Sequence, residues 1–162
     1  NMASSVRSTT CMKWWLLGAA MGEESITIKV VENELDPDQL KHNLKTDGCG
    51  AVVSFLGLVR DFDTGEEVLS LEFDSWKEKL FSVLERLANE STSLHGVSSI
   101  VIAHRIGVVS ANMPIVCIHV ASAHRKEAFE SCSWLIDELK SQAPLWKKEI
   151  KVSGATWKAG LG

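Results

Sequence analysis

Residues 115–152 read IVCIHVASAHRKEAFESCSWLIDELKSQAPLWKKEIKV, and this stretch decides the fold. A β-branched apolar run at 115–122 leads directly into a helical pattern that ends before Pro144, and a short strand pattern follows at 146–152. Basic side chains gather around both ends of the predicted helix: Arg125, Lys126, Lys140, Lys147 and Lys148. A helix with bases at its ends is a favourable place to hold an anion.

The net charge of the whole chain indicates which class of anion it binds. Against 17 Lys and Arg there are 21 Asp and Glu, so the formal net charge is −4. A diffuse basic surface would indicate nucleic acid, whereas bases concentrated around one helix of an acidic chain indicate a small anionic ligand. Because an acidic chain binds a phosphate backbone weakly, we expect no nucleic-acid partner.

Length and cysteine content indicate one domain in a reducing compartment. The 162 residues, 45% of them hydrophobic, suffice for a core that needs no disulfide. Cys11, Cys49, Cys117 and Cys132 form no C-x-x-C pair and have no metal-ligand spacing. We therefore expect no metal or cofactor, and a cytoplasmic location fits best.

Residues 1–22 are set apart from the predicted fold. They contain Arg7, Lys13 and the apolar run WWLLGAA, which is similar to a short secretory h-region but too brief to span a bilayer. A leader, vector-derived residues or a disordered extension are the alternatives. We expect a single domain over residues 23–162, with no membrane-spanning segment.

Upstream patterns alternate between strand and helix. The run at 25–31 (SITIKVV) predicts a strand, and Asp36 followed by Pro37 predicts the start of a short helix. Residues 50–59 (GAVVSFLGLV) are apolar on both faces and indicate a central strand, and 68–73 (VLSLEF) is expected to pair with it as a hairpin.

A second long helix is predicted at 77–92, with an apolar stripe that must face a sheet: Leu80, Phe81, Leu84, Leu87 and Ala88. Strand patterns follow at 97–109 and, near the end of the chain, at 155–159. The order β-α-β-β-α-β-β-α, with two short strands after it, predicts an α+β fold. Its mixed or antiparallel sheet should carry helices mainly on one face.

His124 and Arg125 occupy the predicted turn between the strand at 115–122 and the following helix. Free backbone N–H groups and the positive end of the helix dipole favour an anion at such a turn, and the Arg125 fork suits a phosphate or carboxylate. The alternative is that Ser122 or His124 merely caps the helix.

Lys140 ends the same helix, and Lys147 follows Trp146, which we expect to be buried. A lysine drawn against apolar bulk loses its proton more easily and can act as a base or nucleophile. The commoner alternative is that a lysine in the last helical turn complements the helix dipole.

Arg60 lies where the apolar strand at 50–59 meets a polar loop, a suitable place for an anion clamp. It could equally be a solvated charge paired with Asp61 or Asp63. His104 and the adjacent arginine, at another strand end, are interpreted first as packing or interface residues.

Taken together, these segments resemble a known family. The segments GAVVSFLGLVRD, LSLEF, AHRIG, ASAHRKEAFE, WLIDELK and APLWKKE resemble, in order, the large catalytic subunit of molybdopterin synthase (MoaE-like), from about Ile26 to Lys158. The resemblance implies an α/β hammerhead fold and a homodimer that binds one small subunit at each end, giving a heterotetramer. It also implies a sulfurtransferase of molybdenum cofactor biosynthesis.

The resemblance further implies a substrate, a partner and roles for the residues above. Cyclic pyranopterin monophosphate (precursor Z) would become molybdopterin, with two sulfurs from the C-terminal Gly-Gly thiocarboxylate of a small ubiquitin-like (MoaD-like) subunit. By position, Lys140 and Lys147 match the catalytic lysines, and Arg60, His124 and Arg125 match the substrate-anion pocket. We expect all five side chains to line one cleft.

The chain departs from the family pattern at two places. Asn112-Met113-Pro114 stands where many members have a Gly-acidic turn, and Thr156 precedes Trp157 where many bacterial relatives have arginine. A non-catalytic docking module for a ubiquitin-like sulfur carrier is the main alternative. A phosphate-binding enzyme that acts alone is a weaker one.

Overall fold

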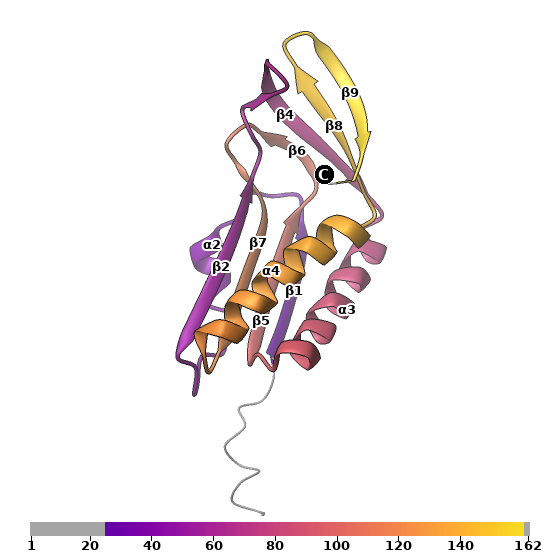
Figure 1. Cartoon of the computed structure of the whole chain (residues 1–162). Helices are drawn as coiled ribbons and strands as arrows, with labels where there is room; N and C mark the ends of the chain where they lie inside the picture. Colours follow the sequence, from indigo (N-terminus) through magenta and orange to yellow (C-terminus); the bar gives the residue numbers. More distant parts are fainter. Residues whose placement is uncertain (1–24, 161–162) are drawn as a thin grey trace, which may run out of the picture.

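The computed structural model describes residues 25–160. The interpretation of residues 1–22 therefore lies outside the described residues. Within the described range, the chain forms two β-sheets, two long helices and one short helix (Figure 1).

The larger sheet has four strands in the order β1-β5-β7-β2. In that order they are Ser25–Val31, Ser99–Arg105, Pro114–Ser122 and Ala51–Leu58. The first pair is parallel and the other two pairs are antiparallel. The sheet is therefore mixed, as the order of elements predicts.

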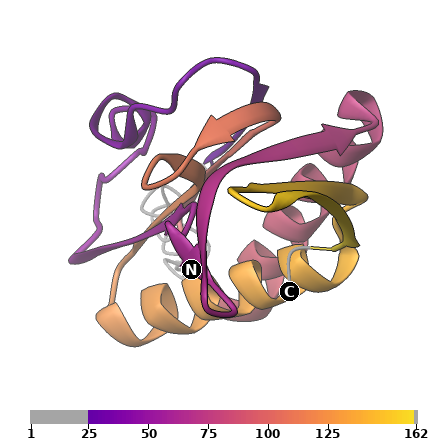
Figure 2. The same cartoon turned by 90° about the horizontal axis from the view of Figure 1, so that it is seen from above.

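Helices α3 (Lys77–His95) and α4 (Arg125–Gln142) cover one face of this sheet, and the short α2 (Pro37–Lys41) lies on the other (Figure 2). The main core lies between the sheet and the two long helices, whereas a smaller cluster packs under α2. The predicted α+β architecture with helices mainly on one face is confirmed.

The caps and apolar stripes of the helices follow from local sequence. Asp36 Oδ1 accepts hydrogen bonds from the backbone N–H groups of Asp38 and Gln39, and Pro37 occupies the first helical position. In α3 the predicted stripe is buried except for Phe81, which is 40% exposed. Phe81 follows Leu80 by one residue, which turns it about 100° away from the sheet.

The second sheet lies at one end of the first (Figure 1). Its order is β3-β4-β8-β9, and β6 also pairs with β4. In chain order these strands are Phe62–Asp63, Glu66–Ser75, Gly107–Ser110, Leu145–Lys151 and Gly154–Ala159.

The run expected to be one strand at 97–109 is divided between the two sheets. β5 ends at Arg105 in the larger sheet, and β6 starts at Gly107 in the smaller one. Gly107 has φ 83°, a left-handed conformation that glycine adopts without steric cost. The chain thus turns sharply where the two sheets meet.

Two expectations about β2 are wrong. It is an edge strand, since β7 is its partner and the other side of β2 carries no strand among residues 25–160. It also forms no hairpin with β4, which pairs with β3, β6 and β8. The strand has apolar residues on both faces, which predicted burial on both faces. In the structure one face is open, because Val52, Leu56 and Leu58 are exposed.

The helix–sheet core generates a stability prediction. Leu84 is completely buried in α3, so Leu84→Ala removes buried methyl groups and leaves a cavity. We expect it to lower the free energy of unfolding by about 2–5 kcal/mol, measured by urea titration. Phe81→Ala on the same helix is the control and should change it by less than about 1 kcal/mol. Equal effects of the two variants would contradict this packing.

Candidate active site

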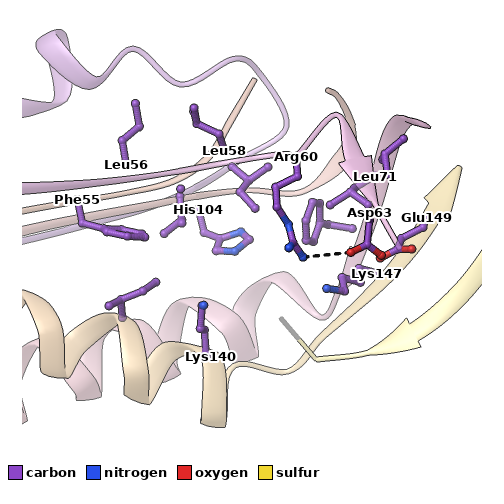
Figure 3. A pocket seen from close by; sticks show the side chains of 16 residues that line it. Phe55, Leu56, Leu58, Arg60, Asp63, Leu71, His104, Lys140, Lys147 and Glu149 are labelled. Atoms are coloured by element: carbon purple, nitrogen blue, oxygen red, sulfur yellow. Dashed lines mark ion pairs between the residues drawn. The ribbon is translucent and has the colours of Figure 1, made fainter. Parts of the chain in front are cut away.

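A cleft of about 430 Å³ opens where the two sheets meet, beside the last turn of α4 (Figure 3). Its lining comes from β2, β3, β4, β5, β7, β8 and α4, and from Arg60 between β2 and β3. Apolar side chains form one part of the wall, and charged side chains gather at the end nearer the second sheet (Figure 3). Such a division suits a ligand with an anionic group and a flat or apolar body.

Lys147 is buried in this lining because of its phase along β8. Side chains alternate in a strand, so Leu145, Lys147 and Glu149 face inward while Trp146 faces outward. Trp146 is 51% exposed, and the expectation that it is buried is wrong. Lys147 itself is 8% exposed. Burial lowers the pKa of its ammonium group below the usual 10.5, although the Glu149 carboxylate opposes this effect.

Lys140 reaches the same cleft from the opposite wall. It lies in the last turn of α4, and Figure 3 shows its side chain directed from the helix toward the strands. Unlike Lys147, it is exposed, so its ammonium group remains accessible to a molecule entering the cleft. The two lysines thus face one space from a helix and from a strand.

Arg60 stands at the mouth of the cleft. Its Nη2 lies 3.5 Å from Asp63 Oδ1, and its side chain is 74% exposed. The alternative pairing with Asp63 is therefore present, but an exposed ion pair is worth little and leaves the guanidinium open to a second anion. Arg60 both lines the cleft and pairs with its neighbour.

Asp63 and Glu149, the two carboxylates in the cleft wall, both form ion pairs with lysines. Lys158 Nζ lies 2.9 Å from Glu149 and 3.3 Å from Asp63, and Lys151 lies within 3.6 Å of both. A hydrogen bond from Lys158 is the main cause that holds the pKa of Asp63 below its usual range. Because these bases balance the carboxylates, the lining and its neighbours together carry a net positive charge, which favours an anionic ligand.

His104 is a further residue of the lining. It is completely buried at the end of β5, and its ring packs edge-on against Phe73. Burial lowers its pKa from 6.5 to about 4, so the ring is neutral at physiological pH. Sequence reasoning gave His104 a packing role, which it has, but missed its place in the cleft.

His124 and Arg125 do not reach this cleft within one chain. Both are exposed at the start of α4, where His124 is the N-cap residue but its side chain makes no capping hydrogen bond. Lys140 lies fifteen residues further along the helix than Arg125, which is roughly 22 Å at 1.5 Å per residue. The expectation that all five residues line one cleft is wrong for a single chain.

Three other features of the described residues complete the description of the site and its surroundings. No helix between residues 25 and 160 is long and apolar enough to cross a bilayer. In that same range, no group of three His, Cys, Asp or Glu side chains is placed to hold a metal ion. Cys117 and Cys132 are buried free thiols, as their apolar surroundings predict.

Comparison with models of protein families shows the family to which the chain belongs. The model of the family described as MoaE protein matches residues 30–142, which include β2, β7 and all of α4. The chain belongs to the MoaE family. The resemblance inferred from short motifs is thereby confirmed over most of the chain.

Individual relatives agree with this assignment. A molybdopterin synthase catalytic subunit from Pseudomonas aeruginosa is 37% identical over 137 residues, which cover 83% of this chain and 91% of that protein. Molybdopterin synthase from Staphylococcus aureus, a crystal structure, matches with a TM-score of 0.77 and 29% identity, covering 81% of this chain and 96% of that one. The second likeness confirms the predicted fold class.

A third relative shows the fold alone. A complex of subunits 1 and 2 of molybdopterin-converting factor from Helicobacter pylori contains a chain that matches with a TM-score of 0.68 and 24% identity, covering 82% of this chain and 90% of that one. The MoaE-family architecture is thus common to chains that differ at most positions.

The buried His104 generates a pH prediction. Between pH 6.5 and pH 4 the unfolded chain binds a proton at this position that the folded chain does not, so stability falls as the pH falls through this window. We expect His104 to account for a loss of about 2 kcal/mol between pH 7 and pH 5, measured by urea unfolding. His104→Asn, which does not titrate, should show a smaller loss; parallel pH profiles would contradict the prediction.

Proposed function

We propose that this chain is the catalytic subunit of a molybdopterin synthase. In this role it converts cyclic pyranopterin monophosphate to molybdopterin, with two sulfurs from the C-terminal thiocarboxylate of a small ubiquitin-like subunit. The observation that carries the proposal is the convergence of Lys140, Lys147 and Arg60 on one cleft in a MoaE-family chain.

The charges of the cleft fit such a substrate. A cyclic phosphate is an anion, and the exposed Arg60 guanidinium presents a planar fork to it at the cleft mouth. Phe55, Leu71 and Phe73 supply an apolar wall for a flat heterocycle. The phosphate therefore binds near Arg60, and the pterin ring lies further in.

The two lysines serve different steps because their surroundings differ. Lys147 is buried, and its lowered pKa brings the ammonium closer to giving up a proton, which suits acid/base work or substrate positioning. Lys140 is exposed at the opposite wall, where a partner's extended tail can reach it. In the proposed mechanism Lys140 contacts the thiocarboxylate terminus and assists sulfur transfer.

His124 and Arg125 enter the mechanism only through a second copy of the chain. They are exposed at the far end of α4, and the backbone N–H groups of a helix start can hold an anion. In the proposed homodimer these residues from one protomer reach the cleft of its partner and contact the substrate phosphate.

Loss of either lysine tests the catalytic assignment. We expect Lys140→Ala and Lys147→Ala each to lower the rate of dithiolene product formation by about a hundredfold to ten-thousandfold, with a thiocarboxylated partner supplied. Lys126→Ala is the control, since Lys126 is exposed on the same helix and pairs with the exposed Glu130 one turn further on. Full activity in both lysine variants would refute the assignment. A wild-type chain that binds the tail but releases no product would be a docking module.

A mixture of two inactive variants tests the shared cleft. When Arg125→Ala and Lys147→Ala copies are unfolded and refolded together, half of the dimers carry one of each. One site in each mixed dimer then has both native residues, so about a quarter of wild-type activity should return. If each site belonged to one protomer, the mixture would stay as inactive as its components.

A further inference from the structure

The tautomer of His104 follows from its single hydrogen bond. Its Nδ1 lies 2.8 Å from the carbonyl oxygen of Arg105. A carbonyl oxygen only accepts, so Nδ1 carries the hydrogen, and in a neutral ring Nε2 then carries a lone pair. His104 therefore offers one buried acceptor atom beside the cleft.

That acceptor has no hydrogen-bond partner within residues 25–160. His119, a buried histidine on neighbouring β7, is different: its Nδ1 lies 2.7 Å from Ser54 Oγ, and its Nε2 lies 2.9 Å from the Pro37 carbonyl oxygen. Buried polar atoms in folded proteins are almost always bonded, because an unpaired one loses its hydration without compensation. The unsatisfied atom of His104 thus requires an explanation that His119 does not.

The place of His104 in the cleft supplies the explanation. Figure 3 shows its ring projecting from the sheet into the space between Phe55 and Arg60, above Lys140. The ring is held by its edge contact with Phe73, at 5.8 Å between centroids, and by the hydrogen bond to the Arg105 carbonyl. Both restraints fix the ring while leaving Nε2 unbonded.

We propose that His104 is a substrate-contacting residue whose Nε2 accepts a hydrogen bond from an N–H or O–H group of the bound heterocycle. The inference rests on the proposed function and deepens it, since it fixes how the substrate lies. A phosphate oxygen is itself an acceptor and is repelled by the Nε2 lone pair. The phosphate is therefore directed to Arg60, and the donor-bearing ring to the buried end of the cleft.

The contact also makes His104 a determinant of specificity. A site that offers a buried acceptor discriminates against a ligand that lacks the matching donor, because the acceptor is then left unpaired. Inorganic phosphate, which needs only the cations, should bind without regard to His104. The affinity for the pterin should thus depend on His104, whereas the affinity for inorganic phosphate should not.

Two substitutions separate this contact from a purely structural role. His104→Asn places an amide N–H where Nδ1 lies and can keep the bond to the Arg105 carbonyl, but it removes the acceptor. His104→Gln reaches the position of Nε2 and can present an amide oxygen there. His119→Asn is the control, since the same change is made at a buried histidine whose two ring nitrogens bond within the chain.

The experiment is calorimetric titration of the full chain and these variants with cyclic pyranopterin monophosphate, and separately with inorganic phosphate. We expect His104→Asn to weaken pterin binding about tenfold or more, the loss of one hydrogen bond, and to leave phosphate binding unchanged. His104→Gln should recover part of the loss, and His119→Asn should bind the pterin as the wild type does.

Unchanged pterin binding by a folded His104→Asn variant would overturn the inference and leave the proposed function standing. A wild-type chain that binds no pterin would overturn both. For variants that fail to fold, the ring nitrogens of wild-type His104 are followed by ¹⁵N NMR. The Nε2 resonance should move when the pterin is added, whereas a resonance that stays in place at saturation overturns the inference.

Discussion

The pairing of β8 with β4 is the constraint on which the site depends. Its register sets Lys147 opposite Phe73, and the alternation of side chains then turns Lys147 and Glu149 inward together. A slip of one residue would bring Trp146 and Lys148 into the cleft instead. The turn at Gly107 has a matching effect, because it ends β5 at the point where the second sheet begins and so leaves His104 at the junction.

Two groups in this cleft are buried at some cost to stability. Lys147 is buried with a lowered pKa, and His104 has an unbonded acceptor, although an apolar residue would fill either place without loss of hydration. Elsewhere in the described core, buried polar atoms such as those of Ser91 and Ser131 bond to each other. Within the described residues, four buried side-chain atoms have no hydrogen-bond partner: those of His104 and Glu149 line this cleft, and those of His95 and Glu127 lie outside it. A cleft that combines such atoms with a buried lysine is typical of a functional site.

Local chemistry made much of this fold predictable from sequence. Asp36 and Pro37 mark the start of α2, and the 3.6-residue period identifies the buried stripe of α3. Strand pairing was harder to predict, since a two-sided apolar strand such as β2 can be central or can expose one face. The phase of β8 was also ambiguous, because tryptophan and the aliphatic stem of lysine can both be buried. The separation of Arg125 from Lys140, in contrast, follows directly from helix length.

The central claim is that one electropositive cleft between the two sheets receives the pterin substrate. A crystal structure of the chain soaked with cyclic pyranopterin monophosphate tests it most directly. We expect difference density for the phosphate beside Arg60 and for the ring between Phe55 and His104, with Lys140 and Lys147 on opposite sides. Density for the pterin at another surface, with this cleft unchanged, would contradict the claim.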